Sequence, residues 1–122
     1  MPKDTKNFKA SEFTCKCGCG SNNISQTLIN TLQRIRDKLG LPITIKSGYR
    51  CPSHNKKEGG KANSAHVKGT AVDIKVNKTD SAFRYKLIAH ALGEGINRIG
   101  IGTDFVHLDI DRGLPQYQIW VY

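Results

Sequence analysis

A histidine and an aspartate stand seven positions apart in "SAHVKGTAVDIKV" (residues 64–76), with a glycine between them. On a continuous helix, seven residues span about 10 Å of axis, roughly double what two ligands of one metal can bridge. On a continuous strand they lie more than about 20 Å apart and on opposite faces. His66 and Asp73 can therefore meet only if the chain folds back between them, and Gly69 permits that reversal without steric cost. The stretch is predicted to form a loop, a tight bend and a strand.

A second polar cluster lies in "GTDFVHLDI" (residues 102–110). The alternation of a strand places His107 and Asp109 on one face, and Asp104 precedes them where the backbone can still turn. Acidic residues are scarce in this chain, yet Asp104, Asp109 and Asp111 fall within eight residues. A bound dication is one reason for such crowding of like charges.

His66, Asp73 and His107 are the candidate metal ligands, because two histidines and one carboxylate form a usual catalytic zinc set that leaves the fourth position to water. Zinc lowers the pKa of that water towards about 7 and polarises a carbonyl oxygen. Peptide hydrolysis also needs a base near the water, and Asp104, three residues before a ligand, is the nearest candidate. Arg50 in "SGYR" offers a permanently charged fork to an oxyanion or a substrate carboxylate.

Two stretches carry the apolar repeat of amphipathic helices. The first begins at Asn23 or Ser25 and ends at Gly40, a natural C-terminal stop. The second begins at Thr79 or Asp80 and continues to about residue 92. Residues 1–23 read instead as an extended, polar lead-in that contains three of the four cysteines.

The remaining periodic stretches predict short strands. They cover residues 43–47, 71–76, 96–102, 105–110 and 117–122. Short links between the last three indicate antiparallel pairing, so the predicted class is α+β with a mainly antiparallel sheet and flanking helices. Residues 48–65 read as one long loop, and a loop of this length in a small domain is usually functional or disordered.

The chain has 122 residues, which is consistent with one domain over residues 1–122. No apolar run is long enough to span a membrane, and the N-terminus lacks the apolar core of a secretory signal. The net charge is +9, with eleven bases and four acids in the first sixty residues. Such a charge suits an anionic partner such as a cell-wall polymer or a membrane surface, or it serves solubility alone. Nucleic acid is disfavoured, because no dense basic run or aromatic-interleaved basic stripe is present.

Three of the four cysteines lie in "CKCGCG" as Cys15, Cys17 and Cys19, and the fourth is Cys51. Neighbouring C-x-C thiols are poor partners for one another in a disulfide, and the C-x-x-C spacing typical of a four-thiolate zinc knot is absent. Three interpretations stay open. The cysteines are reduced structural thiols, or Cys51 forms a disulfide with the N-terminal group, or the four hold a small metal site.

The segments "SGYRCPSHN", "GGKANSAHVKGTAVDI" and "FVHLDI" together resemble the zinc D-Ala-D-Ala carboxypeptidase family of peptidoglycan peptidases. That family includes D-Ala-D-Ala dipeptidases and carboxypeptidases, phage L-alanyl-D-glutamate endopeptidases and the related sonic hedgehog signalling domain. The pattern S-x-H-x-x-G-x-A-x-D matches from Ser64 to Asp73, and the later acid-x-x-H matches at Asp104 and His107. The resemblance covers roughly residues 8–122 and implies a small hedgehog-like or DD-peptidase-like domain with a zinc cleft.

By this resemblance His66, Asp73 and His107 bind one catalytic Zn²⁺. Asp104 is the base, where many relatives have glutamate, and Arg50 faces the substrate carbonyl or carboxylate. Two further residues are expected to line the cleft and contact substrate, Ser64 and Tyr49. Asp109 is expected to orient a ligand imidazole, as metal-bound histidines usually require.

The function implied is a zinc metallopeptidase that cuts peptidoglycan stem peptides at bonds containing D-amino acids, either as a D-Ala-D-Ala carboxypeptidase or as an L-alanyl-D-glutamate endopeptidase. A monomeric, bacteriolytic phage endolysin or a wall-remodelling enzyme is expected, made in the cytoplasm and acting in the periplasm or cell wall after release. Its charge would suit anionic walls or lipopolysaccharide.

Two alternative hypotheses assign the chain a function other than catalysis. The first is a non-catalytic, zinc-containing wall-binding module, which the hedgehog relatives suggest is possible. The second is a basic nucleic-acid binder organised by the cysteine group.

Overall fold

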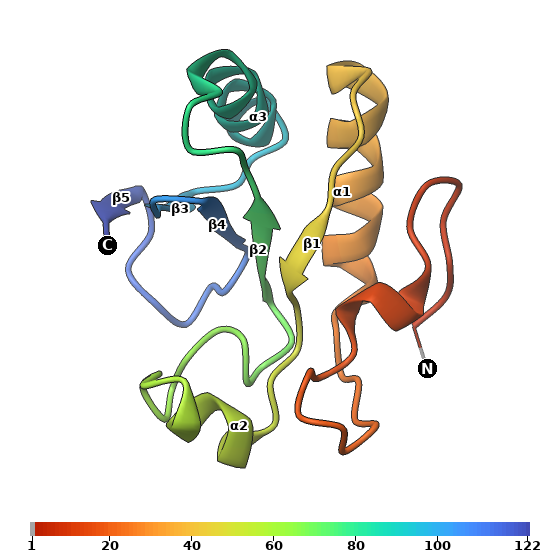
Figure 1. Ribbon diagram of the computed structural model, residues 1–122, viewed down its shortest axis with the longest axis vertical. Coiled ribbons are helices and arrows are strands. Elements are labelled where there is room, and N and C mark those ends of the chain that lie inside the picture. Colours follow the sequence, from red (N-terminus) through yellow and green to blue (C-terminus); the bar gives the residue numbers. More distant parts are fainter. Residues whose placement is uncertain (1) are drawn as a thin grey trace.

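A computed structural model describes residues 2–122 as a five-stranded sheet with helices around it (Figure 1). The element order is η1 (Ala10–Phe13), α1 (Gln26–Leu39), β1 (Ile45–Ser47), α2 (Pro52–Lys57), β2 (Ala71–Lys75), α3 (Ser81–Gly93), β3 (Arg98–Ile101), β4 (Phe105–Asp109) and β5 (Gln118–Val121). The predicted α+β class with a mainly antiparallel sheet is confirmed. Within residues 2–122, no helix combines the length and the apolar character needed to cross a bilayer.

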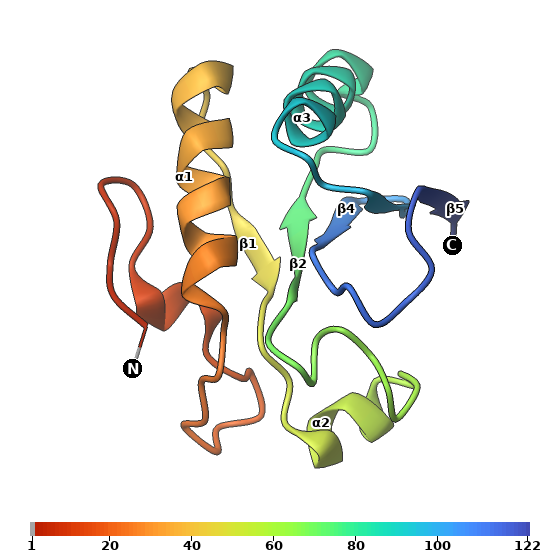
Figure 2. The same ribbon diagram turned by 180° about the vertical axis from the view of Figure 1, so that it is seen from behind.

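Both long helices form where the apolar repeat predicts them. The Ser25 side chain accepts a hydrogen bond from the Leu28 N–H and caps α1, and Gly40 ends that helix with a φ of 69°. Asp80 caps α3 in the same way through the Phe83 N–H. Figures 1 and 2 show α3 at one end of the molecule and α2 at the opposite end, while α1 runs from the α3 end along the molecule beside β1.

The core lies between these helices and one face of the sheet. Apolar side chains of alternate strand residues are fully buried there, namely Val72, Ile74, Ile99, Val106 and Leu108. Because strand residues alternate between faces, the residues between them point to the opposite face. The helices therefore cover one face and leave the other free to carry polar side chains.

The lead-in is less polar than its sequence suggests. Phe8 is 1% exposed and Phe13 is fully buried, and both belong to the main core. The Tyr49 N–H donates to the carbonyl oxygen of Phe13 at 2.9 Å. The segment is thus packed against the domain and contains a 3₁₀ turn, η1, that the extended interpretation missed.

Two other expectations are corrected. Residues 48–65 are not all loop, because α2 begins at Pro52, a favourable first helical residue. The strand order is β1-β2-β4-β3-β5, and β5 pairs parallel to β3. The chain after β4 does reverse direction as predicted, but residues 110–117 cross β3 and place β5 on its far edge, so the pairing with its new neighbour is parallel.

Candidate metal centre and its cavity

One lateral row of residues crosses the sheet on the face opposite α1 and α3. Asp73 on β2 pairs with His107 on β4, which pairs with Gly100 on β3. Gly100 pairs with Trp120 on β5, and a Cβ on Gly100 would lie 2.7 Å from the indole Nε1. Because Gly100 has no side chain, the ring of Trp120 can approach His107, and the two ring centroids are 5.3 Å apart.

His66 reaches the same point from the loop before β2. Gly69 adopts a φ of 75°, and its carbonyl oxygen accepts from the Ser25 N–H at 2.8 Å. A Cβ on Gly69 would lie 1.9 Å from the carbonyl oxygen of Asn23, so the bend fits only glycine. It brings His66 Nε2 to 3.3 Å from Asp73 Oδ1. The predicted reversal that lets His66 and Asp73 meet is confirmed.

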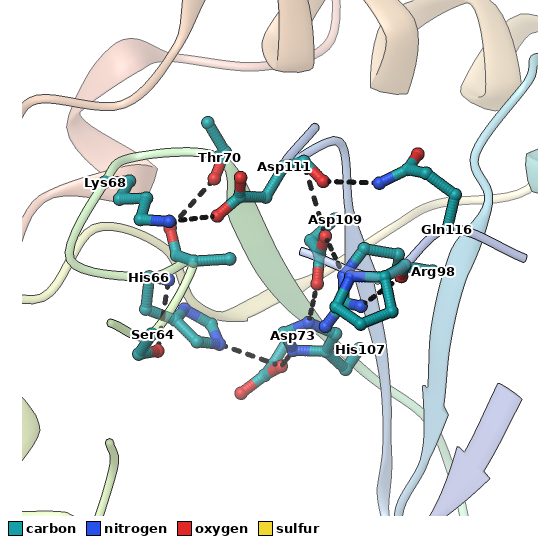
Figure 3. Close-up of polar contacts among 12 residues, drawn as sticks. Ser64, His66, Lys68, Thr70, Asp73, Arg98, His107, Asp109, Asp111 and Gln116 are labelled. Carbon is teal, nitrogen blue, oxygen red and sulfur yellow. Dashed lines mark hydrogen bonds and ion pairs between the residues drawn. The ribbon is translucent and has the colours of Figure 1, made fainter. Parts of the chain in front are cut away.

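The outer nitrogens of both imidazoles are occupied by acceptors. His66 Nδ1 lies 2.8 Å from the Gly48 carbonyl oxygen, which can only accept, so this nitrogen carries the proton. His107 Nε2 lies 2.7 Å from Asp109 Oδ2 (Figure 3). The other oxygen of Asp109 accepts from Arg98 Nε at 2.8 Å, which holds the carboxylate in place.

The inner nitrogens, His66 Nε2 and His107 Nδ1, both face Asp73 Oδ1, at 3.3 Å and 3.0 Å. One donor atom of each of the three residues lies within 4.8 Å of the others, and all three residues are buried. With protons on the outer nitrogens, the inner lone pairs and the carboxylate repel unless a cation lies among them. Two imidazoles and one carboxylate are a donor set that Zn²⁺ accepts. The residues present therefore fit a zinc ion.

Without an ion, protons on the inner nitrogens take its place and hold the same atoms together. Burial alone would raise the pKa of Asp73, but hydrogen bonds from His107 and His66 outweigh it and hold the carboxyl well below its usual range. Burial would lower the pKa of His107, and the bonds to Asp109 and Asp73 outweigh it and raise it. Asp73 is thus an anion at neutral pH, ready to bind a cation.

The three clustered acids do not share one cation, contrary to the argument from their crowding. Asp104 pairs with Lys46 at 3.0 Å, Asp111 pairs with Lys68 at 2.9 Å, and Asp109 pairs with Arg98 and His107. Each carboxylate has its own basic partner. Only Asp109 touches the candidate centre.

A cavity of about 770 Å³ opens onto this centre. Arg50 and Ser64 line it, as predicted, and Arg50 Nη2 lies 3.3 Å from Asp73 Oδ2. The structure does not bring the other two predicted residues to the cavity. Tyr49 is 6% exposed and packs outside the lining, and the Asp104 side chain is 56% exposed beside Lys46, which lowers the pKa of its carboxyl.

Several cavity residues carry no signal in a single sequence. Arg98 holds Asp109, and an arginine in a short strand belongs to no motif. Trp120 and Tyr122 form an aromatic wall through the parallel strand β5 and the residue after it, and Glu58 follows α2. These cavity residues could have been found only from the strand order and the position where α2 ends.

The sequence profile of the family described as Peptidase M15 matches residues 6–109. No match is found among curated proteins. The match covers most of the chain, and the chain belongs to the peptidase M15 family. Membership makes it a metallopeptidase of a zinc-dependent family whose substrate class is peptidoglycan, consistent with the donor set at His66, Asp73 and His107.

Proposed function

We propose that this chain is a zinc peptidase that hydrolyses peptidoglycan stem peptides at bonds containing D-amino acids, of the D-Ala-D-Ala carboxypeptidase type. The observation that carries the proposal is the convergence of His66 Nε2, Asp73 Oδ1 and His107 Nδ1 at a cavity large enough for a peptide. These three atoms would hold the ion. Bound there, zinc would polarise the scissile carbonyl and lower the pKa of a coordinated water.

Residues around the proposed ion have separate roles. Asp109 fixes the orientation of His107 through the Nε2 proton and is itself held by Arg98. Arg50 offers a permanent positive charge beside Asp73, to a developing oxyanion or a terminal carboxylate. Lys61 adds a cation to the cavity wall besides Arg98, which is paired with Asp109, and Ser64 lines the same wall. Cationic groups beside the ion support the carboxypeptidase type over the L-alanyl-D-glutamate endopeptidase.

The proton-transfer role stays with Asp104, three residues before His107, but only if its carboxylate leaves Lys46. Two variants test whether Asp104 or another group transfers the proton. If Asp104 is the base, Asp104→Asn abolishes hydrolysis while zinc is retained. Lys46→Met then frees the Asp104 carboxylate and preserves or raises the rate of hydrolysis. Equal, near wild-type rates in both variants would assign the proton transfer to another group.

A second candidate function is a zinc-containing wall-binding module without turnover. One observation favours it, namely that the predicted base lies outside the cavity and forms an exposed ion pair. This module would bind purified peptidoglycan and zinc but release no product.

One experiment tests these alternatives together. Metal-loaded protein is incubated with purified peptidoglycan, and the products are identified by mass spectrometry. Loss of a single alanine from the stem supports the carboxypeptidase, and release of free stem peptides supports the endopeptidase. Binding without products, with zinc present, supports the module. In a separate assay, a fall in the turbidity of a suspension of whole bacterial cells would support the bacteriolytic, endolysin-like role, to which the net charge of +9 is suited on anionic walls.

A further inference from the structure

The four cysteines form a second group of candidate metal ligands, and all of them precede the histidine and aspartate ligands in the chain. Their sulfurs all lie within 4.8 Å of one another. Cys15 Sγ and Cys17 Sγ are 3.5 Å apart, and Cys17 Sγ and Cys51 Sγ are 3.7 Å apart. Four sulfurs bound tetrahedrally at the usual zinc distance are separated by about 3.8 Å. The spacing in the structure is therefore that of a tetrathiolate centre.

The local backbone is shaped to gather three of these sulfurs. Gly18 and Gly20 adopt φ values of 89° and 77°, which permit the loop between Cys15 and Ser21 to bend twice. The Cys15 N–H donates to the Ser21 carbonyl oxygen at 3.0 Å and closes that loop. Three thiols spaced by single residues thus point to one side, although the C-x-x-C spacing is absent.

Backbone N–H groups donate to three of the four sulfurs. Cys51 N–H donates to Cys15 Sγ at 3.4 Å, His54 N–H to Cys51 Sγ at 3.4 Å, and Ser21 N–H to Cys19 Sγ at 3.5 Å. Such donors stabilise negatively charged sulfur, which is the state of a metal-bound thiolate. The excess of basic residues in the first sixty positions further offsets the charge of four thiolates.

The two other interpretations, a disulfide from Cys51 and reduced structural thiols, explain fewer of these observations. All four thiols are free, and a single disulfide from Cys51 to the N-terminal group would leave the other two cysteines without a role. A second disulfide would then have to form within the C-x-C-x-C run, where neighbours bridge poorly. Reduced structural thiols would be expected in the core, yet Cys17 and Cys19 are exposed. A half-exposed group of convergent sulfurs with N–H donors is explained by a bound metal ion.

We propose that Cys15, Cys17, Cys19 and Cys51 bind a second Zn²⁺, with four protein ligands and no position left for water. The ion joins the lead-in to the turn before α2. Cys51 directly follows Arg50, so the centre also fixes the backbone of the arginine that lies beside Asp73. The second zinc is structural and positions one wall of the cavity.

The test is the metal content of the full chain, purified without chelators under reducing conditions. Wild type is expected to hold two zinc ions per chain, and His66→Ala and Cys19→Ser one each. His54→Ala is the matched control, because its side chain pairs with Glu58 and only its backbone contacts a sulfur, so two zinc ions are expected. Loss of an ion in His54→Ala would overturn the assignment to four sulfurs.

A spectroscopic measurement keeps the proposal testable if a cysteine variant fails to fold. Cobalt is substituted into His66→Ala, which retains all four thiols. Intense sulfur-to-cobalt charge-transfer absorption is expected, as only a thiolate centre gives it. Absence of this absorption, or a disulfide detected by mass spectrometry of the native protein, would overturn the proposal. Because the histidine centre is removed in this variant, the result is independent of the proposed peptidase activity.

Discussion

The two groups of candidate ligands are built in opposite ways. His66, Asp73 and His107 are buried at the base of a cavity, two of them on paired strands, and together they offer three protein donors. The cysteine group lies on loops, half of it exposed, and offers four. Three donors beside a cavity leave a position for chemistry, whereas four donors close the coordination sphere. Within one small domain, two paired strands and a loop carry the candidate reactive centre, and loops carry the proposed closed centre.

The largest expected effect separates these roles directly. Asp73→Asn keeps the size of the side chain but removes the anion between the two imidazoles. We expect loss of one of two zinc ions and a fall in peptidase rate of about 10³-fold or more, since the ion stabilises charge in the transition state. The circular dichroism spectrum should be unchanged. A variant that keeps both ions and its activity would contradict the assignment of the open centre.

The second effect concerns the point where the two regions abut. Gly69→Ala places a Cβ against the Asn23 carbonyl oxygen, in the segment that follows the cysteine loop, and we expect the free energy of unfolding to fall by about 3 kcal/mol. Gly40→Ala is the control. It has a similar positive φ but nothing within 4 Å of its Cβ, so it should cost about 1 kcal/mol. Equal costs, measured by urea unfolding, would show that the contact with Asn23 is unimportant.

A smaller effect tests the layer behind the open centre. Asp109→Asn weakens the acceptor for the His107 Nε2 proton, and we expect zinc affinity at this centre to fall about 10- to 100-fold. Asp111→Asn is the matched control, because that buried carboxylate bonds Lys68 and touches no imidazole. Its zinc affinity should stay unchanged. Competition with a coloured chelator measures both, and a comparable loss in the two variants would mean that general electrostatics, and not orientation, is responsible.

The sequence predicts best what depends on local pattern. The helices α1 and α3 follow from apolar repeats and from caps at Ser25 and Asp80, and the bend at Gly69 follows from the need for a positive φ. The convergence of His66, Asp73 and His107 could also be predicted, from the local patterns around each residue together with the family resemblance.

What escaped prediction depends on which distant segments become neighbours. The parallel pairing of β5 brings Trp120 to the cavity, and no local feature of "YQIWVY" indicates whether its partner is β3 or β4. Arg98 gains its role only when β3 places it beside Asp109. The helix α2 has six residues, too few for a repeat, although Pro52 offered a signal. The exposed ion pair of Asp104 likewise depends on a distant segment, because its partner Lys46 lies on β1.

The register of β2 with β4 also sets the order in which the molecule can assemble. The histidine at position 107 reaches Asp73 only after two strands separated by residues 76–104 have paired, and such long-range pairing is slow to form. Zinc at that centre can therefore bind only late, so it should slow unfolding while leaving the refolding rate unchanged. Three of the four thiols, by contrast, lie within five residues and can collect an ion while most of the chain is still unstructured.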